Sequence, residues 1–271
     1  MNIKKQLLLL LLMLFLNPTL GWSTVNKVNR PNKVSARKIH KANHVSIKRF
    51  KQVKTDDNQG NKKLIKEKIP YTAEQQAVAA YDLAMQSLLN GDKATASISL
   101  HKVLDQSPSH INARLQLIDY YRGIGEVNKV EELLQQGLGF NSKEPLYIKQ
   151  MALLLNNKEE YGKALTLLLT MPKIKQDDVE YKQLLALTYF HEGFFDLAQK
   201  HYIQLLRTEP NNSNWRLGLA IAQDAAGEYQ KAVENFARAR HYGGLDSETI
   251  KYIQQRIDNL QQEPSVLTRN S

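Results

Sequence analysis

The sequence has no cysteine among its 271 residues. This excludes disulfide frameworks, zinc sites built on thiolates, thiol nucleophiles and lipid attachment at an N-terminal cysteine. The sequence also lacks a P-loop, a glycine-rich dinucleotide-binding turn and an HExxH motif. His40 and His44 are four residues apart, but no carboxylate lies nearby to complete a metal site. We therefore predict a protein that is not an enzyme and that uses no metal or cofactor.

The formal net charge of +10 comes from one region of the chain. Residues 24–70 contain fourteen Lys or Arg residues and three acidic residues, whereas 21 basic and 24 acidic residues follow residue 70. The basic region has few large apolar residues and no sustained hydrophobic period, so we predict a disordered linker over 24–70. It acts either as a solvated spacer or as a contact for a membrane or another anionic polymer. Phe50 is its only aromatic residue, and this argues against nucleic acid as a partner, because base stacking needs aromatic side chains.

The N-terminal residues resemble an export signal. Lys4 and Lys5 precede an apolar run over 7–16, and the small residues Gly21 and Ser23 follow it. A membrane-spanning helix needs roughly 20 apolar residues, and this run is shorter. We predict a signal peptide over 1–23, which would place the protein in the periplasm or cell envelope. An uncleaved membrane anchor is the alternative, because the basic flank after the run resists translocation.

After residue 76 the sequence repeats itself every 34 residues. Five units fit without insertion or deletion, at 77–110, 111–144, 145–178, 179–212 and 213–246. Position 8 of each unit is small in four of the five, and position 20 is small in all: Ala84, Ile118, Ala152, Ala186 and Ala220, then Ala96, Val130, Ala164, Ala198 and Ala232. Small residues at these places allow two antiparallel helices to approach closely. A fixed period of this length indicates stacked helical hairpins.

Three further columns have a physical reason. Positions 7 and 24 hold large apolar or aromatic residues that fill the space between units: Leu83, Leu117, Met151, Leu185 and Leu219, then Leu100, Leu134, Leu168, Tyr202 and Phe236. Position 15 lies at the turn between the two helices, where glycine accepts a positive φ; it holds Gly91, Gly125, Glu159, Gly193 and Gly227. Proline at position 32 of two units, Pro108 and Pro210, stops the second helix.

With these columns the chain resembles the tetratricopeptide repeat (TPR) family over residues 77–246. The resemblance implies an all-α fold, a right-handed superhelical TPR solenoid of five helix-hairpin repeats preceded by the disordered basic tail. The TPR domain would span 71–261, and a disordered tail would occupy 262–271. The third unit departs from the pattern, with Glu159 at the turn and Pro172 early, so we expect its second helix to end early.

A capping helix is predicted over 247–261. Asp246 or Ser247 is suited to cap its N-terminus. Its apolar residues recur at helical spacing on one face: Ile250, Ile253, Ile257 and Leu260. A helix with one apolar and one polar face seals the end of a solenoid.

The family resemblance implies that the first helix of each unit lines a concave surface. A protein or peptide partner would lie there, for example an amphipathic helix or an extended apolar segment. The predicted partner-binding residues are Tyr81, Met85, Leu115, Asp119, Arg122, Lys149, Leu153, Gln183, Leu187, Phe190, Leu217 and Ile221. The alternative for the apolar members is that they belong to the core between repeats. Arg122 and Lys149 are the two cations placed there, and this set is too small to predict a clamp for a carboxylate.

The last unit and the cap, from Asn214 through Gly227 and Ala232 to Leu260, also resemble MSHA pilus biogenesis proteins of the MshN type. Those proteins share the order of membrane signal, low-complexity linker and repeats. The resemblance implies a scaffold that helps to assemble a type IV pilus at the cell envelope. A periplasmic or secreted repeat protein with an unrelated partner is the alternative.

Overall fold

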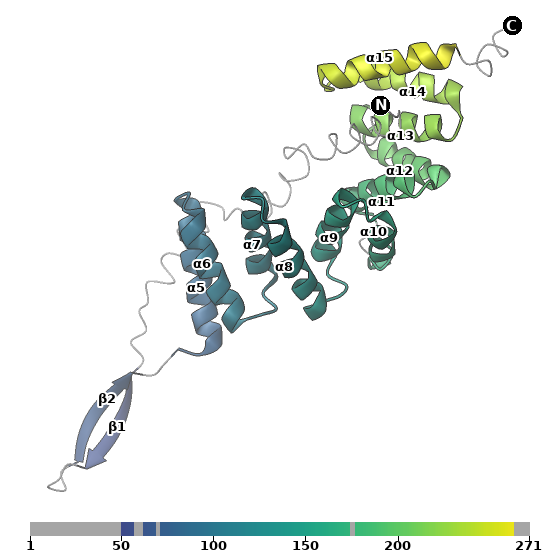
Figure 1. The fold of residues 1–271 in the computed structure, drawn as a ribbon. Helices are drawn as coiled ribbons and strands as arrows, with labels where there is room; N and C mark the ends of the chain where they lie inside the picture. The colour runs from purple at the N-terminus through teal and green to yellow at the C-terminus, as the bar shows by residue number, and fades with distance from the viewer. Residues whose placement is uncertain (1–49, 57–61, 69–70, 174–176, 263–271) are drawn as a thin grey trace. The chain divides into compact units, whose positions relative to one another are not determined.

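The computed structural model describes residues 50–56, 62–68, 71–173 and 177–262 (Figure 1). These residues belong to two compact units, and the chain passes from one unit to the other between Leu133 and Leu134. Every element described after residue 70 is a helix, so the predicted helical fold class is confirmed. The predicted signal peptide, the linker before residue 50 and the tail after residue 262 lie outside the described residues.

The unit that ends at Leu133 begins with a β-hairpin. Strand β1 (Phe50–Asp56) pairs antiparallel with β2 (Lys62–Lys68), so that Phe50 lies opposite Lys68. The prediction of a linker without regular structure was wrong for these two segments. Neither segment has a sustained alternation of apolar and polar residues. That pattern is the signal from which a strand is predicted.

Helices complete this unit, in the order α5 (Ala73–Leu89), α6 (Lys93–Gln106), α7 (Ile111–Gly123) and the first half of α8 (Val127–Phe140). Helices α5 and α6 form a tightly packed hairpin, and α7 packs against α6. Ala84 and Ala96 are buried in the hairpin, at the two columns of small residues. The small side chains therefore allow the close helix contact that the repeat predicted.

The unit from Leu134 onward continues the same plan. After the end of α8 it contains α9 (Pro145–Asn157), α10 (Tyr161–Leu168), α11 (Val179–His191), α12 (Phe195–Thr208), α13 (Ser213–Ala225), α14 (Tyr229–Tyr242) and α15 (Ser247–Gln261). Each of these helices from α9 packs against the next one in the chain. One apolar cluster joins Trp215 and Leu219 of α13 to Tyr202 and Leu205 of α12 and to Ala186 of α11. Each hairpin is thus completed by its neighbour.

A capping side chain precedes the first helix of every hairpin after the first one, and another precedes the closing helix α15. Its oxygen or nitrogen accepts a hydrogen bond from a backbone N–H in the first turn, at His110, Glu144, Asp178, Asn212 and Asp246. These residues are 34 apart and form a column at the last position of each unit. Such caps satisfy backbone donors that have no partner within the helix. The sequence analysis identified the last of them and missed the column.

The turns within the hairpins require a left-handed backbone. Four of them have glycine with φ near +80°: Gly91, Gly125, Gly193 and Gly227. The third hairpin has Glu159 in this place with φ of 59°. Its second helix, α10, ends at Leu168, as the sequence predicted. The third hairpin is therefore the least regular of the series.

Arginine occupies the fourth position of two units. Arg114 is buried and donates to the carbonyl of Pro108 at 2.5 Å and to that of Leu133 at 3.4 Å. Arg216 likewise donates to the carbonyl of Pro210 at 2.5 Å. In both places the guanidinium binds the carbonyl of the proline that ends the preceding helix. Charged donors of this kind satisfy carbonyls that the helix leaves unpaired.

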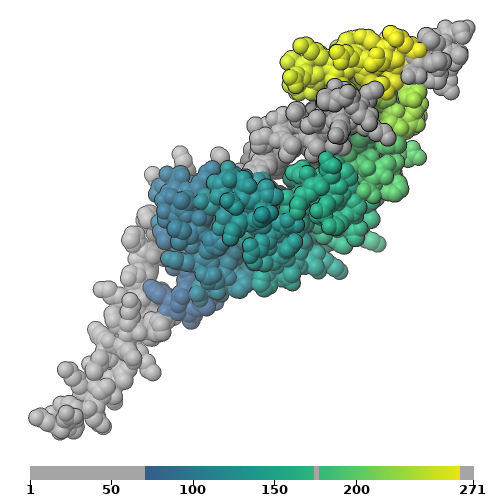
Figure 2. All heavy atoms as spheres, in the orientation of Figure 1, coloured from purple at the N-terminus to yellow at the C-terminus, as the bar shows by residue number. Residues whose placement is uncertain are grey.

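Helix α15 closes the second unit. Ile253, Ile257 and Leu260 are buried in a cluster with Phe236 and Ile221, and α15 packs against α14. Helix α15 is the yellow part of the chain in Figure 2. Ile250 was predicted to share this face, but it is exposed in the first turn of the helix. Thr249, in the same turn, is buried in its place.

The first residue of the column at position 7, Leu83, is not buried as predicted. Position 7 is buried at Leu117, Met151, Leu185 and Leu219, but Leu83 in α5 is 49% exposed. The prediction that Leu83 fills a space between units was wrong. The later residues pack against a preceding hairpin, and the described residues contain no helix before α5.

Candidate partner-binding surface on the first helices

In the unit that ends at Leu133, the predicted contacts form a mixed surface of aromatic, apolar and charged side chains. Tyr81, Met85, Asp119 and Arg122 are half-buried. The Tyr81 ring lies 4.8 Å from the ring of His110, between centroids, and its burial raises the pKa of its hydroxyl. Half-buried side chains of this kind offer contact area without unfolding the repeat.

Asp119 and Arg122 form an ion pair on α7. Their charged atoms are 3.7 Å apart, and at least a quarter of the surface of each side chain is exposed. Desolvation raises the pKa of Asp119, and the positive charge of Arg122 opposes that rise. A pair at this spacing contributes little to stability.

Lys149 has a different role from the one predicted by its position. Its ammonium lies 3.0 Å from a carboxylate oxygen of Asp178 and 2.6 Å from one of Glu180. Burial by itself would lower the pKa of Lys149, but Glu180 and Asp178 outweigh that effect and raise it. The buried ammonium ties α9 to the start of α11. Lys149 is therefore a bridge between hairpins, with its charge already matched.

Two further bridges join first helices at a spacing that the sequence analysis did not test. The buried amide of Asn156 donates to the hydroxyl of Thr188 at 2.9 Å. The guanidinium of Arg256 donates to both oxygens of Asp224, at 2.6 and 2.7 Å. In each pair the partners are 32 residues apart, two fewer than the repeat. A search for complementary polar residues at that offset would have found both pairs.

Four predicted contacts lie in the core. Leu115, Leu187, Leu217 and Ile221 have at most 5% of their surface exposed. Leu187, Leu217 and Ile221 belong to the cluster that Phe236 and the capping helix complete. The alternative stated for the apolar residues, that they are core between repeats, describes these four. A partner reaches them only if the cluster opens.

The remaining predicted contacts of the second unit are Leu153, Gln183 and Phe190, which are half-buried. The Phe190 ring lies 5.6 Å from that of Phe195 and 5.4 Å from that of His191, between centroids. The sequence analysis did not foresee this aromatic group, because its members come from two helices. Gln183 adds a polar group beside it on α11.

His191 belongs to the same aromatic group. It stacks on Tyr161 at 4.3 Å with an interplanar angle of 10°. Burial lowers the pKa of His191 to about 4, so the imidazole is neutral at pH 7. The ring therefore acts as an aromatic surface and carries no charge toward a partner.

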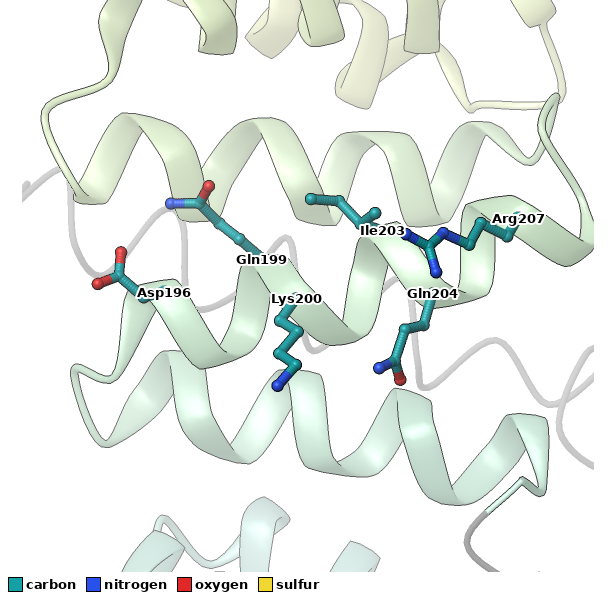
Figure 3. A pocket seen from close by; sticks show the side chains of 6 residues that line it. All are labelled: Asp196, Gln199, Lys200, Ile203, Gln204 and Arg207. Atoms are coloured by element: carbon teal, nitrogen blue, oxygen red, sulfur yellow. The ribbon is translucent and has the colours of Figure 1, made fainter.

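A shallow depression lies elsewhere, on the second helix of the fourth hairpin. Figure 3 shows that its lining comes entirely from α12: Asp196, Gln199, Lys200, Ile203, Gln204 and Arg207. Gln199 and Ile203 point away from Lys200 and Gln204. The lining is a strip of helix surface and does not enclose a ligand. Pockets that bind small molecules usually bury most of the ligand.

Within the described residues, no cluster of three or more His, Cys, Asp or Glu side chains is placed to hold a metal ion. No helix among them is long and apolar enough to cross a membrane.

Of three comparisons with known proteins, only the one with solved structures gives matches. A scan against family models and a search of curated proteins gave no match. Among solved structures, the chain is similar to MamA, with a TM-score of 0.55 and 20% identity over 62% of this chain and 92% of that one. It is similar to YrrB, described as a TPR protein with an unusual peptide-binding site, with a TM-score of 0.58 and 14% identity over 66% and 92%. It is also similar to PilF of Pseudomonas aeruginosa, with a TM-score of 0.53 and 17% identity over 73% and 95%. At these identities the likeness shows the fold alone.

Proposed function

The chain has the tetratricopeptide-repeat fold, and from that premise we propose that it is a protein-interaction scaffold. A partner segment binds to the first helices of the hairpins. The observation that carries the proposal is the set of half-buried side chains on these helices, beside bridges that hold the helices in place. YrrB, which has the same fold, is described as having a peptide-binding site, and this supports the same use of the fold here.

The surface of the first unit suits a segment with both apolar and charged side chains. Tyr81 and Met85 on α5 offer apolar contact, and Asp119 and Arg122 on α7 offer one charge of each sign. An amphipathic helix places apolar side chains three and four residues apart with charges beside them. We therefore favour an amphipathic helix over a purely apolar peptide.

The second unit contributes Leu153, Gln183 and Phe190, with neutral His191 next to Phe190. Lys149 and Arg256 already form ion pairs with carboxylates of the chain, so neither cation is offered to an anionic group of the partner. Aromatic side chains provide large contact area at low entropic cost. The second unit is accordingly suited to apolar and aromatic side chains of the partner.

Site-specific photo-crosslinking tests the proposal. A photo-reactive amino acid replaces Met85 or Gln183 on first helices, and Ile98 or Ile203 on second helices serves as the matched exposed control. In cells that express the full chain, Met85 and Gln183 should each give a crosslinked partner protein. Ile98 and Ile203 should not give it. Equal crosslinking from all four positions would contradict a partner surface on the first helices.

The cell envelope is the location that we propose, with pilus assembly as the specific role. The basic and apolar N-terminal pattern supports export, and the resemblance of the last unit and the cap to MshN-type proteins supports the pilus role. Fractionation of cells with and without residues 1–23 tests the location. Deletion of the gene should reduce surface pili. Normal piliation would leave the scaffold proposal with an unrelated envelope partner.

The basic region supports a second candidate, contact with an anionic membrane or polymer. Strands β1 and β2 contain six lysines, at 51, 54, 62, 63, 66 and 68, and they pair into one hairpin. Basic segments near an anionic surface contribute about 1 kcal/mol per charge. Deletion of residues 24–70 should abolish binding to anionic vesicles and leave the crosslinks from Met85 and Gln183 unchanged.

A further inference from the structure

The turn of the fourth hairpin has apolar side chains where the other hairpins have polar ones. Position 16, which precedes the second helix, is acidic in the other four units: Asp92, Glu126, Glu160 and Glu228. Position 19 is threonine or lysine in the same units: Thr95, Lys129, Lys163 and Lys231. In the fourth unit these positions hold Phe194 and Leu197, which are 50% and 40% exposed. Two solvent-facing polar residues are thus replaced by two exposed apolar ones in a single hairpin.

The neighbouring hairpins show what this exchange removes. In the third hairpin the charged groups of Glu160 and Lys163 lie 2.5 Å apart, and the matching pair of the fifth hairpin is at the same distance. An acidic residue at the start of a helix also interacts favourably with the helix dipole. Phe194 has an edge-on ring contact with Tyr189, at 6.2 Å between centroids, but half of its surface still meets solvent. Apolar side chains that break a local pattern in this way are typical of a binding surface.

Phe194 and Leu197 line a shallow depression, which we call the turn hollow. Its lining is completed by Gly193, Phe195 and Asp196 from the same turn and the start of α12, and by Ala226 from the turn of the fifth hairpin. The turn hollow therefore lies between the turns of two successive hairpins. The partner surface proposed above lies instead on the first helices.

Two carboxylates border the apolar pair and determine the charge of the turn hollow. Glu192 and Asp196 are exposed, and neither forms an ion pair with another residue that the structure describes. Lys200, one turn after Asp196, points away from its carboxylate in Figure 3. Lys163 and Lys231 of the neighbouring turns are already paired with glutamates. The border of the turn hollow therefore presents unmatched negative charge.

This charge selects among the occupants of the turn hollow. A second copy of the chain, placed on the same patch across a two-fold axis, would bring the carboxylates of Glu192 and Asp196 against their own copies. An anionic membrane or polymer would be repelled by the same carboxylates. A partner segment with basic residues places opposite charges at the border of the hollow, so the charges favour this occupant.

We propose that the turn hollow binds a basic segment of a partner protein. One large apolar side chain of the segment packs against Phe194 and Leu197, and its lysine or arginine residues pair with Glu192 and Asp196. The apolar contact supplies affinity through burial, and the charges give preference for a basic partner. The inference is independent of the surface proposed above, because none of these four residues lies on a first helix.

Binding of synthetic peptides to the full chain tests the proposal. The probe is a short fluorescent peptide in which one phenylalanine is flanked by lysines. In one matched peptide glutamates replace the lysines, and in another serine replaces the phenylalanine. Fluorescence anisotropy should show that the wild type binds the probe at least about tenfold more tightly than either matched peptide. Added salt should weaken binding of the probe, because the border contacts are ionic.

A variant that copies the neighbouring hairpins shows whether the turn hollow is the binding site. Phe194→Glu combined with Leu197→Lys restores the pair found in the third and fifth turns, so the chain should fold with an unchanged or higher urea midpoint. Its affinity for the probe should fall about tenfold or more. The matched control is Ile203→Lys, at a 42% exposed apolar position further along α12, which should leave the affinity unchanged. Glu192→Gln combined with Asp196→Asn should remove the preference for lysine over glutamate in the peptide.

Several results would overturn the proposal. One is a wild type that binds none of the peptides, or binds all three equally. Another is a Phe194→Glu, Leu197→Lys variant that binds the probe as tightly as the wild type. A large loss of stability in that variant would show that the apolar pair serves the fold. Sedimentation that gives two chains for the wild type and one for that variant would assign the turn hollow to a second copy instead.

Discussion

The first and last helices of the described helical region, α5 and α15, differ in the side chains that they expose on their outer faces. Helix α15 buries Ile253, Ile257 and Leu260 against the preceding hairpin and turns charged side chains outward. Its link to α13 includes the two hydrogen bonds between Arg256 and Asp224. Helix α5 instead leaves the large apolar side chain of Leu83 exposed.

The comparison teaches that a repeat position does not determine burial by itself. Leu83 and Leu219 are the same residue at the same position, yet Leu83 is 49% exposed and Leu219 is 5% exposed. In stacked repeats each hairpin contacts only its neighbours, so burial depends on whether a neighbour is present. Stability should therefore respond differently to the same substitution in the two places.

The largest expected effect comes from that substitution. Leu219→Ala should lower the free energy of unfolding by about 3 kcal/mol, because it leaves a cavity in the cluster with Tyr202 and Leu205. Leu83→Ala in the full chain should cost under about 1 kcal/mol in the monomer, because its side chain already meets solvent. Urea denaturation at low protein concentration measures both values. Equal losses would mean that the α5 face is buried.

The next effect tests the bridge that fastens the capping helix. Arg256→Ala should destabilise the protein by about 2 to 3 kcal/mol, because it leaves the carboxylate of Asp224 buried without its partner. Gln255→Ala, on the exposed face of the same helix, is the control and should change little. Hydrogen exchange should show the loss concentrated in α15. A small, uniform change would mean that the apolar contacts alone hold the cap.

A smaller effect should appear on acidification. The folded-state pKa of His191 is lowered from 6.5 to about 4 by burial, so between these values the unfolded chain binds a proton that the folded chain does not. The stability from neutral His191 is complete above about pH 6.5 and falls as the pH is lowered toward 4. His191→Phe keeps a ring against Tyr161 and should remove this part of the pH dependence.

His101→Phe supplies the control for that measurement. His101 is exposed on α6 and hydrogen-bonds to Tyr121. Its replacement should leave the slope of stability between pH 4 and 6.5 close to that of the wild type. A slope that His191→Phe does not change would show that other groups carry the acid sensitivity.

The smallest effect distinguishes the irregular third hairpin from its neighbours. Glu159 adopts φ of 59° where the other turns have glycine, so Glu159→Gly should stabilise the protein by about 1 kcal/mol. Gly193→Ala, at φ of +83°, should destabilise it by a similar amount. Thermal unfolding measures the two shifts, which should have opposite signs. The same sign for both would contradict a strained turn at Glu159.

Much of the helical plan follows from residues near one another in the sequence. The 34-residue period placed the hairpins, and helices α7, α9, α11 and α13 begin at the first residues of their units. The turn glycines and the short α10 were also predictable from local backbone chemistry. The column of capping residues was visible in the sequence too, at the last position of each unit, and was overlooked.

The candidate site was harder to predict, because its residues depend on partners from other helices. Lys149 was placed on the surface by its repeat position, yet Asp178 and Glu180 bury and neutralise it. Leu187 and Leu217 were placed there too, and they lie in the core. Repeat position indicates which helix face a residue occupies, but it does not indicate how closely the next helix approaches that face.

By itself, the sequence determined the period, the helical hairpins, their turns and the closing helix. Each of these depends on the size or backbone preference of residues a few places apart, which recur in every unit. The tertiary structure alone decided which copies of a position are buried, which charges are matched, and that the face of α5 stays open. These properties depend on contacts between residues in different helices, such as Leu219 with Tyr202 and Lys149 with Asp178, and no single residue type specifies them.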